Sequence, residues 1–246
     1  MPSISKKELQ SGMQAFSTRD WHRAKQHFSR AVAQDAHAVD AYVLLSYACS
    51  YLGEYRSARE AALRAAALKS TSPETVADVA ARLRTFNEGK SMVAYISRLG
   101  PPSRLPIPLL LQCAAQFSYL NLQRHAHAFL KEAYAADPEF PPSVVALSQV
   151  LTYLGRGSEV LPLLDKIVTR APRIPEIYGL VGQLGADAPR LQNYIAMARD
   201  ILAQDALPFG ERAKAAFGLH HMLDRQGEYV EAFKMLEEGC RQKRLS

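Results

Sequence analysis

The stretch of sequence that decides the fold is VDAYVLLSYACSYLGEYRSAREAALRAAALKSTS, residues 39–72. It contains two helical segments separated by a turn at Gly53-Glu54, and the small residue Ala58 lies early in the second segment. The same position recurs at one fixed interval, at Ala24, Ala58, Met92, Ala126, Val160 and Tyr194. One more copy follows at Ala232, four positions later than this interval predicts. A helix pair repeated in this way predicts a stack of pairs, because a single pair cannot bury its apolar face alone.

The interval and the residue pattern resemble the tetratricopeptide repeat, whose period is about 34 residues. The second copy carries the pattern at Tyr42, Leu45, Gly53, Tyr55 and Ala58. The prolines that end a repeat in this family are matched at Pro138 and Pro172. The resemblance implies an all-α fold, a right-handed α-solenoid of about seven helix pairs.

We expect one solenoid over residues 1–246, without a linker. The expected repeats are 5–38, 39–72, 73–106, 107–140, 141–174, 175–208 and 213–246. The third and sixth are degenerate, because Met92 and Tyr194 replace the small residue. The four extra residues before the last copy are expected near the turn at 207–210, and the proline-rich stretch 99–108 is interpreted as a rigid elbow.

In the tetratricopeptide family, the first helices of the pairs line a concave groove. Counting back from each small position by 15, 11, 8 and 7 gives the lining, from which we select eight candidate partner-binding residues. They are Met13, Tyr47, Tyr51, Tyr119, Gln149, Tyr153, His221 and Arg225. Tyr51, Tyr119 and Tyr153 hold equivalent positions and predict a ladder on which a polypeptide segment can lie. The alternative is that these tyrosines pack against the next repeat.

Composition narrows the classes of partner. The net charge is +6 and the pI is about 9.2, but basic and acidic residues are interspersed, and no basic stripe interleaved with aromatic residues is visible. The sequence therefore disfavours a nucleic-acid partner. The first ten residues lack the apolar centre of a secretory peptide, and no apolar run is long enough to span a membrane. Three scattered cysteines suit a reducing compartment, so the cytoplasm is expected.

No catalytic or metal-binding motif is recognised. Gly89-Lys90-Ser91 resembles the end of a phosphate-binding loop, but Arg84 stands where that loop needs its first glycine. His125 and His127 point to different sides of a helix, so they do not form a metal pair. We therefore expect a chain that is not an enzyme and that holds neither cofactor nor metal.

The last repeat has a narrower resemblance. Gln226-Gly227-Glu228-Tyr229 and the later motif Glu-Glu-Gly-x-Arg-x-x-Arg at 237–244 resemble the repeat that precedes the catalytic domain of bacterial tetratricopeptide-repeat sulfotransferases. The resemblance implies a non-catalytic scaffold region that binds a protein or peptide partner. The alternatives are a free-standing cytoplasmic adaptor and, behind it, a nucleic-acid-associated scaffold. A dimer is compatible with the sequence.

Overall fold

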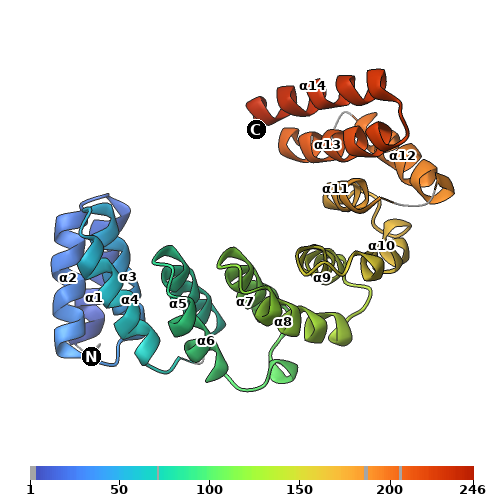
Figure 1. The fold of residues 1–246 in the computed structure, drawn as a ribbon. Coiled ribbons are helices and arrows are strands. Elements are labelled where there is room, and N and C mark those ends of the chain that lie inside the picture. Colours follow the sequence, from blue (N-terminus) through green and yellow to red (C-terminus); the bar gives the residue numbers. More distant parts are fainter. Residues whose placement is uncertain (1–3, 71, 186–187, 205–206) are drawn as a thin grey trace. The chain divides into compact units, whose positions relative to one another are not determined.

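The computed structural model describes residues 4–70, 72–185, 188–204 and 207–246. This part of the chain forms fourteen α-helices and two short 3-10 helices, and it contains no strand (Figure 1). The first helices of the pairs are α1 (Ile4–Ser17), α3 (Val39–Tyr51), α5 (Pro73–Thr85), α7 (Ile107–Tyr119), α9 (Pro141–Tyr153), α11 (Pro175–Leu184) and α13 (Phe209–Arg225). The second helices are α2 (Trp21–Gln34), α4 (Tyr55–Ala67), α6 (Gly89–Ser97), α8 (Gln123–Ala136), α10 (Val160–Val168), α12 (Ala188–Leu202) and α14 (Tyr229–Leu245).

The chain divides into two compact units, Met1–Phe129 and Leu130–Ser246. The boundary lies within α8. The proline-rich stretch 99–108 falls inside the first unit, where it forms the short 3-10 helix η1 (Pro102–Arg104) and leads into α7. The expectation of a single solenoid over residues 1–246 stays a prediction.

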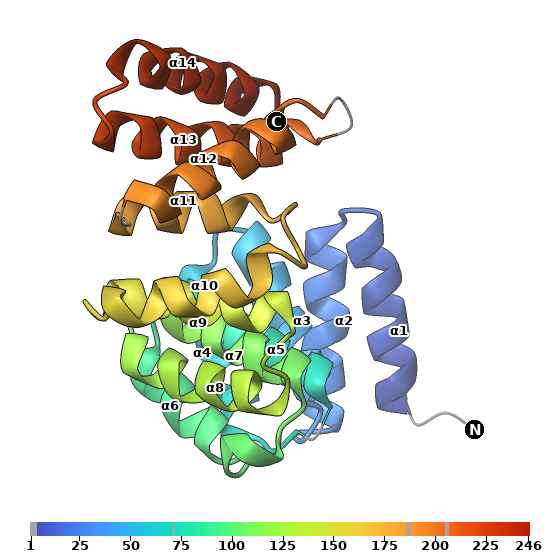
Figure 2. The ribbon, with the colours of Figure 1, turned by 90° about the vertical axis from the view of Figure 1, so that its right-hand side faces the viewer.

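Within each unit the helices pack as the repeat pattern predicts. In the first unit α1 packs on α2, α3 on α4 and α5 on α6, while the first helices α3, α5 and α7 also contact one another in order. In the second unit α9, α11 and α13 form the corresponding row, and α13 packs along α14 (Figure 2). The fold class is therefore an all-α solenoid of helix pairs.

The position that defines the repeat is buried in every copy. The seven residues at this position, Ala24, Ala58, Met92, Ala126, Val160, Tyr194 and Ala232, are all at most 2% exposed. Ala58 and Ala126 are at 0%. Each lies on the second helix of its pair, and its burial is consistent with the helix contact expected at this position.

The turns inside six of the seven pairs share one backbone conformation. A residue with positive φ occurs at Arg19, Gly53, Asn87, Asn121, Gly155 and Gly227. In each turn the next residue donates its N–H to a carbonyl five residues earlier, as from Glu54 to Cys49 and from Glu88 to Leu83, at 2.9 Å in both. This is the Schellman closure of a helix end, which places one residue in the left-handed region.

The last pair differs from the others in the length of its first helix. The extra four residues lie near 207–210 as expected, but they do not lengthen the turn. α13 begins at Phe209 and has 17 residues, whereas α3, α5, α7 and α9 have 13. The insertion therefore adds about one helical turn at the beginning of α13.

No helix in the described ranges combines the length and the apolar character that crossing a membrane requires.

Candidate functional site

The eight predicted groove residues are distributed over both units. Met13 lies on α1, Tyr47 and Tyr51 on α3, and Tyr119 on α7, all in the first unit. The other four belong to the second unit, with Gln149 and Tyr153 on α9 and His221 and Arg225 on α13.

Tyr51 and Tyr119 are both accessible in the first unit. Tyr51 is 58% exposed, yet one face of its ring stacks on Trp21 of the preceding pair, with ring centroids 4.2 Å apart and planes 10° apart. Tyr119 is 71% exposed, and the guanidinium carbon of Arg84 lies 4.5 Å from its ring centroid. Tyr51 thus combines the packing role with an exposed face, whereas Tyr119 offers most of its surface to solvent.

Tyr47 has a role that the sequence did not reveal, because it covers a buried arginine. Arg82 on α5 is 4% exposed, and its guanidinium carbon lies 4.3 Å from the Tyr47 ring centroid. Its Nε donates to Ser46 Oγ at 2.9 Å and its Nη2 to Ser50 Oγ at 2.5 Å. No ion pair of Arg82 is found within the described ranges, and burial lowers the pKa of the guanidinium below its ordinary value. Hydroxyls and rings therefore hold this charge between α3 and α5.

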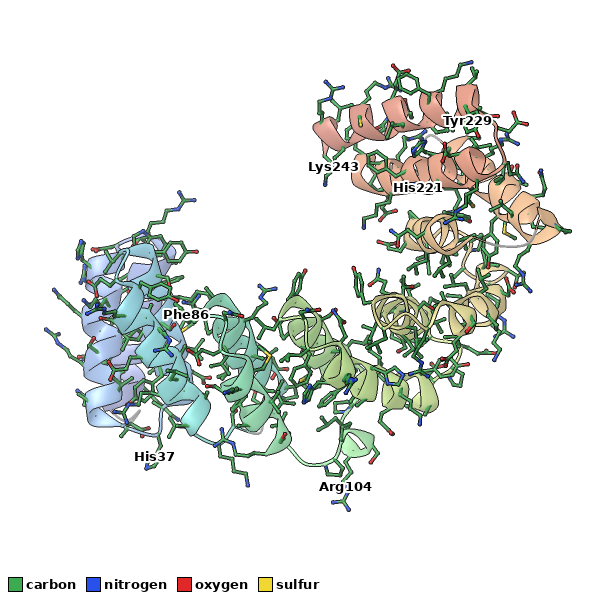
Figure 3. The ribbon with its side chains drawn as sticks, viewed as in Figure 1. His37, Phe86, Arg104, His221, Tyr229 and Lys243 are labelled. Atoms are coloured by element: carbon green, nitrogen blue, oxygen red, sulfur yellow. The ribbon has the colours of Figure 1, made fainter. Side chains whose placement is uncertain are left out.

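A pocket of about 250 Å³ lies across α9, α11 and α13 in the second unit. Its lining residues are Gln149, Thr152, Tyr153, Pro175, Glu176, Gly179, Leu180, Gln183, Lys214, Phe217, Gly218 and His221. Three of the four groove residues predicted for this unit, Gln149, Tyr153 and His221, are among them. Figure 3 labels His221 on α13.

Two glycines give the pocket its shape. Gly218 lets α13 approach α11 closely, because a β-carbon there would lie 2.6 Å from the carbonyl carbon of Tyr178 and 2.8 Å from the nitrogen of Gly179. Gly179 faces the other way, and a β-carbon on it would meet no atom within 4 Å. The first glycine therefore serves packing, and the second leaves space open in the pocket.

The polar groups around the pocket differ in how they are bonded. Lys214 Nζ and Glu176 Oε1 form an ion pair at 2.5 Å between α13 and α11. The side-chain amides of Gln149 and Gln183 make no hydrogen bond within the described ranges. Partial burial, helped by the neighbouring His220, lowers the pKa of His221 below its ordinary value. At neutral pH the pocket therefore presents a neutral imidazole and two amides with free donors and acceptors.

Arg225 does not line the pocket. Its Nε donates to the carbonyl of Gly182 and its Nη2 to the carbonyl of Gln183, both at 2.8 Å. These carbonyls lie in the last turn of α11, where helical acceptors lack partners in their own helix. Arg225 therefore closes the end of α11, a role that its repeat position alone did not indicate.

Groups with metal-binding chemistry are sparse. The described residues contain no cluster of three or more His, Cys, Asp or Glu side chains that could hold a metal ion. Cys49 and Cys113 are free and buried, and Cys240 is free and exposed. Burial raises the pKa of the Cys113 thiol to about 12.

Comparison with solved structures identifies the class of fold. A tetratricopeptide repeat protein from Parabacteroides merdae aligns with a TM-score of 0.61 at 10% identity, over 97% of this chain and 93% of its own. The MamA protein aligns with a TM-score of 0.51 at 13% identity, over 70% of this chain and 94% of its own. The type IV pilus biogenesis factor PilW aligns over 96% of this chain and 99% of its own at 20% identity, with a TM-score of 0.49.

The first of these likenesses assigns the tetratricopeptide-repeat fold to this chain. No protein-family model matches the sequence, and a search of curated proteins finds no relative.

Proposed function

We propose that the chain is a protein-binding scaffold that holds a polypeptide segment in the pocket across α9, α11 and α13. The observation that carries the proposal is that Gln149, Tyr153 and His221 line one pocket. Their repeat positions are those that face a partner in tetratricopeptide folds.

The chemistry of the pocket suits a peptide anchored by one side chain. Its volume of about 250 Å³ is below the range of about 300–1,000 Å³ typical of small-molecule sites, so one large side chain fits it better than a whole metabolite. Leu180 and Phe217 supply apolar walls beside the open space at Gly179. The free amides of Gln149 and Gln183 can pair with main-chain N–H and C=O groups of an extended segment.

The test begins with peptides selected from a random library on the immobilised full chain. Their binding is then measured by fluorescence polarisation on three variants. Gly179→Leu places a side chain in the open space and is expected to weaken binding at least tenfold, about 1.4 kcal/mol. Tyr153→Ala removes an aromatic that is 69% exposed and is expected to cost about 2 kcal/mol if it is a hot spot.

The matched control is Tyr229→Ala, which removes a tyrosine of similar exposure, 67%, on α14 outside the pocket (Figure 3). Its affinity is expected to equal that of the unmodified chain. Selected peptides that bind Gly179→Leu as tightly as the unmodified chain would refute the assignment of this pocket.

A second candidate is the scaffold region of a sulfotransferase, favoured by the motif at 237–244. Packing also accounts for part of this motif. A β-carbon at Gly239 would lie 2.5 Å from the ring of Phe217, and Glu238 Oε1 accepts a hydrogen bond from Gln242 at 2.7 Å. The coding sequence after codon 246 decides between the candidates, because a strand, a phosphate-binding loop and a helix there would support the sulfotransferase.

A further inference from the structure

A row of basic residues recurs at one repeat position in the first unit. The position lies two residues before the buried position that defines the repeat, and the row consists of His22, Arg56, Lys90 and Arg124. All four side chains are exposed. None of them makes a hydrogen bond or an ion pair within the described ranges. The row was not predicted from the sequence, because it lies outside the groove positions.

The row lies on the second helices of the pairs. Its members are the second residues of α2, α4, α6 and α8. Helices packed side by side lie about 8–10 Å apart, so equivalent residues on a stack of helices are separated by a regular distance of that order. Arg56, Lys90 and Arg124 therefore place one cation at the beginning of each of three successive second helices of the first unit.

Helix stability does not explain this row. The beginning of an α-helix carries a partial positive charge, so a cation in the first turn is unfavourable by about 0.3–1 kcal/mol. The first turns of α2, α4, α6 and α8 contain no acidic residue. Neighbouring basic residues do have structural partners, since Lys25 pairs with Glu54 at 2.5 Å and Arg59 pairs with Glu88. The four members of the row neither compensate the partial charge of the helix beginning nor form an ion pair within the described ranges.

The charge of the whole chain is concentrated in the same unit. Residues 1–129 contain 16 Lys and Arg against 9 Asp and Glu, whereas residues 130–246 contain 14 against 15. The net charge of +6 thus arises from the first unit alone. A positive field over that unit raises the local concentration of polyanions.

We propose that this row binds the phosphate backbone of a nucleic acid without reading its bases. Because a nucleic acid carries one charge per nucleotide, cations at a fixed spacing meet phosphates in any register. An acidic polypeptide would need carboxylates at a matching interval. The residues that follow Arg56 and Lys90 in their helices are Ser57 and Ser91, which offer no apolar side chain for insertion into a bilayer. The composition of the chain predicts that a nucleic acid is not the partner. That prediction is untested, and this row of basic residues argues against it.

The experiment measures fluorescence anisotropy of a fluorescein-labelled oligothymidylate of about 20 nucleotides in about 50 mM NaCl, followed by a salt titration. The variant is Arg56→Gln, Lys90→Gln and Arg124→Gln together. We expect its affinity to fall at least tenfold. Because three fewer cations then neutralise phosphates, the slope of log K against log salt should fall by about 2. The thermal midpoint should stay equal or rise, because three unfavourable charges leave helix beginnings.

The matched control is Arg173→Gln, Lys234→Gln and Lys243→Gln, which removes three exposed charges from the second unit. Its affinity for the oligonucleotide is expected to change less than about twofold, since only screened long-range charge is lost. Three results would overturn the proposal: no binding of the oligonucleotide by the unmodified chain, equal losses in both triple variants, or equal competition by poly-L-glutamate at the same charge concentration. The last result would assign the row to an acidic protein.

Discussion

A positive φ is imposed on Arg19, Asn87 and Asn121 by the hydrogen bonds that close their turns. The left-handed region is costly for residues with a β-carbon, about 1–2 kcal/mol, and asparagine tolerates it better than most. Arg19, with φ of 60°, is therefore the least suited side chain among the six turns. The strain at Arg19 is offset because the turn supplies hydrogen-bond donors to carbonyls at the end of α1, as from Asp20 to Ala15.

Replacing Arg19 with glycine is expected to stabilise the protein. The relief of strain exceeds the greater freedom of glycine in the unfolded chain, which leaves a gain of about 0.5–1 kcal/mol. Urea unfolding of Arg19→Gly measures the gain, and Asn121→Gly should show a smaller one. The reverse change, Gly53→Ala, should destabilise the chain. A loss of stability in Arg19→Gly would mean that the side chain makes a contact worth more than the strain.

The sequence predicted residues whose role depends only on the repeat, and it missed those whose role depends on neighbours in space. Ala58 and Ala126 were identified because a small residue is needed wherever two helices meet. The stacking of Tyr51 on Trp21 and the bonding of Arg225 to α11 arise from contacts between pairs, which the interval alone does not specify. The burial of Arg82 could not be predicted from the sequence, because a single arginine in a helix is usually exposed.

At glycine, α11 and α13 approach each other backbone to backbone. Gly218 meets the backbone at Tyr178 and Gly179, and a β-carbon at Gly182 would lie 3.0 Å from the carbonyl oxygen of Gly218. Backbone atoms cannot move aside as the end of a flexible side chain can. The contact therefore fixes both the separation of the two helices and the floor of the pocket.

Opposite effects are expected for alanine at two glycines of this contact. Gly218→Ala should separate α11 from α13 and destabilise by about 1–3 kcal/mol through overpacking. Gly179→Ala enters open space in a helix, so it should stabilise by about 0.5–1 kcal/mol through helix propensity. Thermal melts followed by circular dichroism measure both. Equal signs for the two variants would contradict the assigned directions of these residues.

Helix beginnings were predictable where the fixed repeat interval held. α3, α5, α7, α9 and α11 begin at residues 39, 73, 107, 141 and 175, the starts of the expected repeats. The beginning of α13 was not predictable, since it lies at Phe209, four residues before the expected start at 213. The repeat interval does not predict whether inserted residues lengthen a turn or a helix. In this chain they lengthen α13.

At the scale of the whole molecule, the two units differ in charge more than in architecture. The first carries an excess of basic residues and the second is close to neutral. Like charges within one unit repel, and this repulsion opposes its compact state. The composition of the entire chain does not reveal this difference in net charge. The difference appears when the charged residues of the two units are counted separately.

Salt is therefore expected to stabilise the first unit more than the second. Raising NaCl from about 50 to about 500 mM shortens the screening length to a few ångströms and weakens the repulsion. Amide hydrogen exchange at both salt concentrations reports each unit separately. Protection should increase more in residues 1–129 than in residues 130–246, with the second unit as the internal control. Equal increases would indicate a general salt effect.

The shared shape of the six turns limits how such a gene can change in length. A duplicated or deleted segment of one whole repeat joins one Schellman turn to another, so every remaining helix keeps its inward side. A single inserted codon within a helix rotates everything beyond it by about 100° and turns the buried stripe outward. A gain or loss of whole copies therefore alters the number of helices while keeping the buried stripe, and so does an insertion of about one helical turn such as the four residues at the beginning of α13.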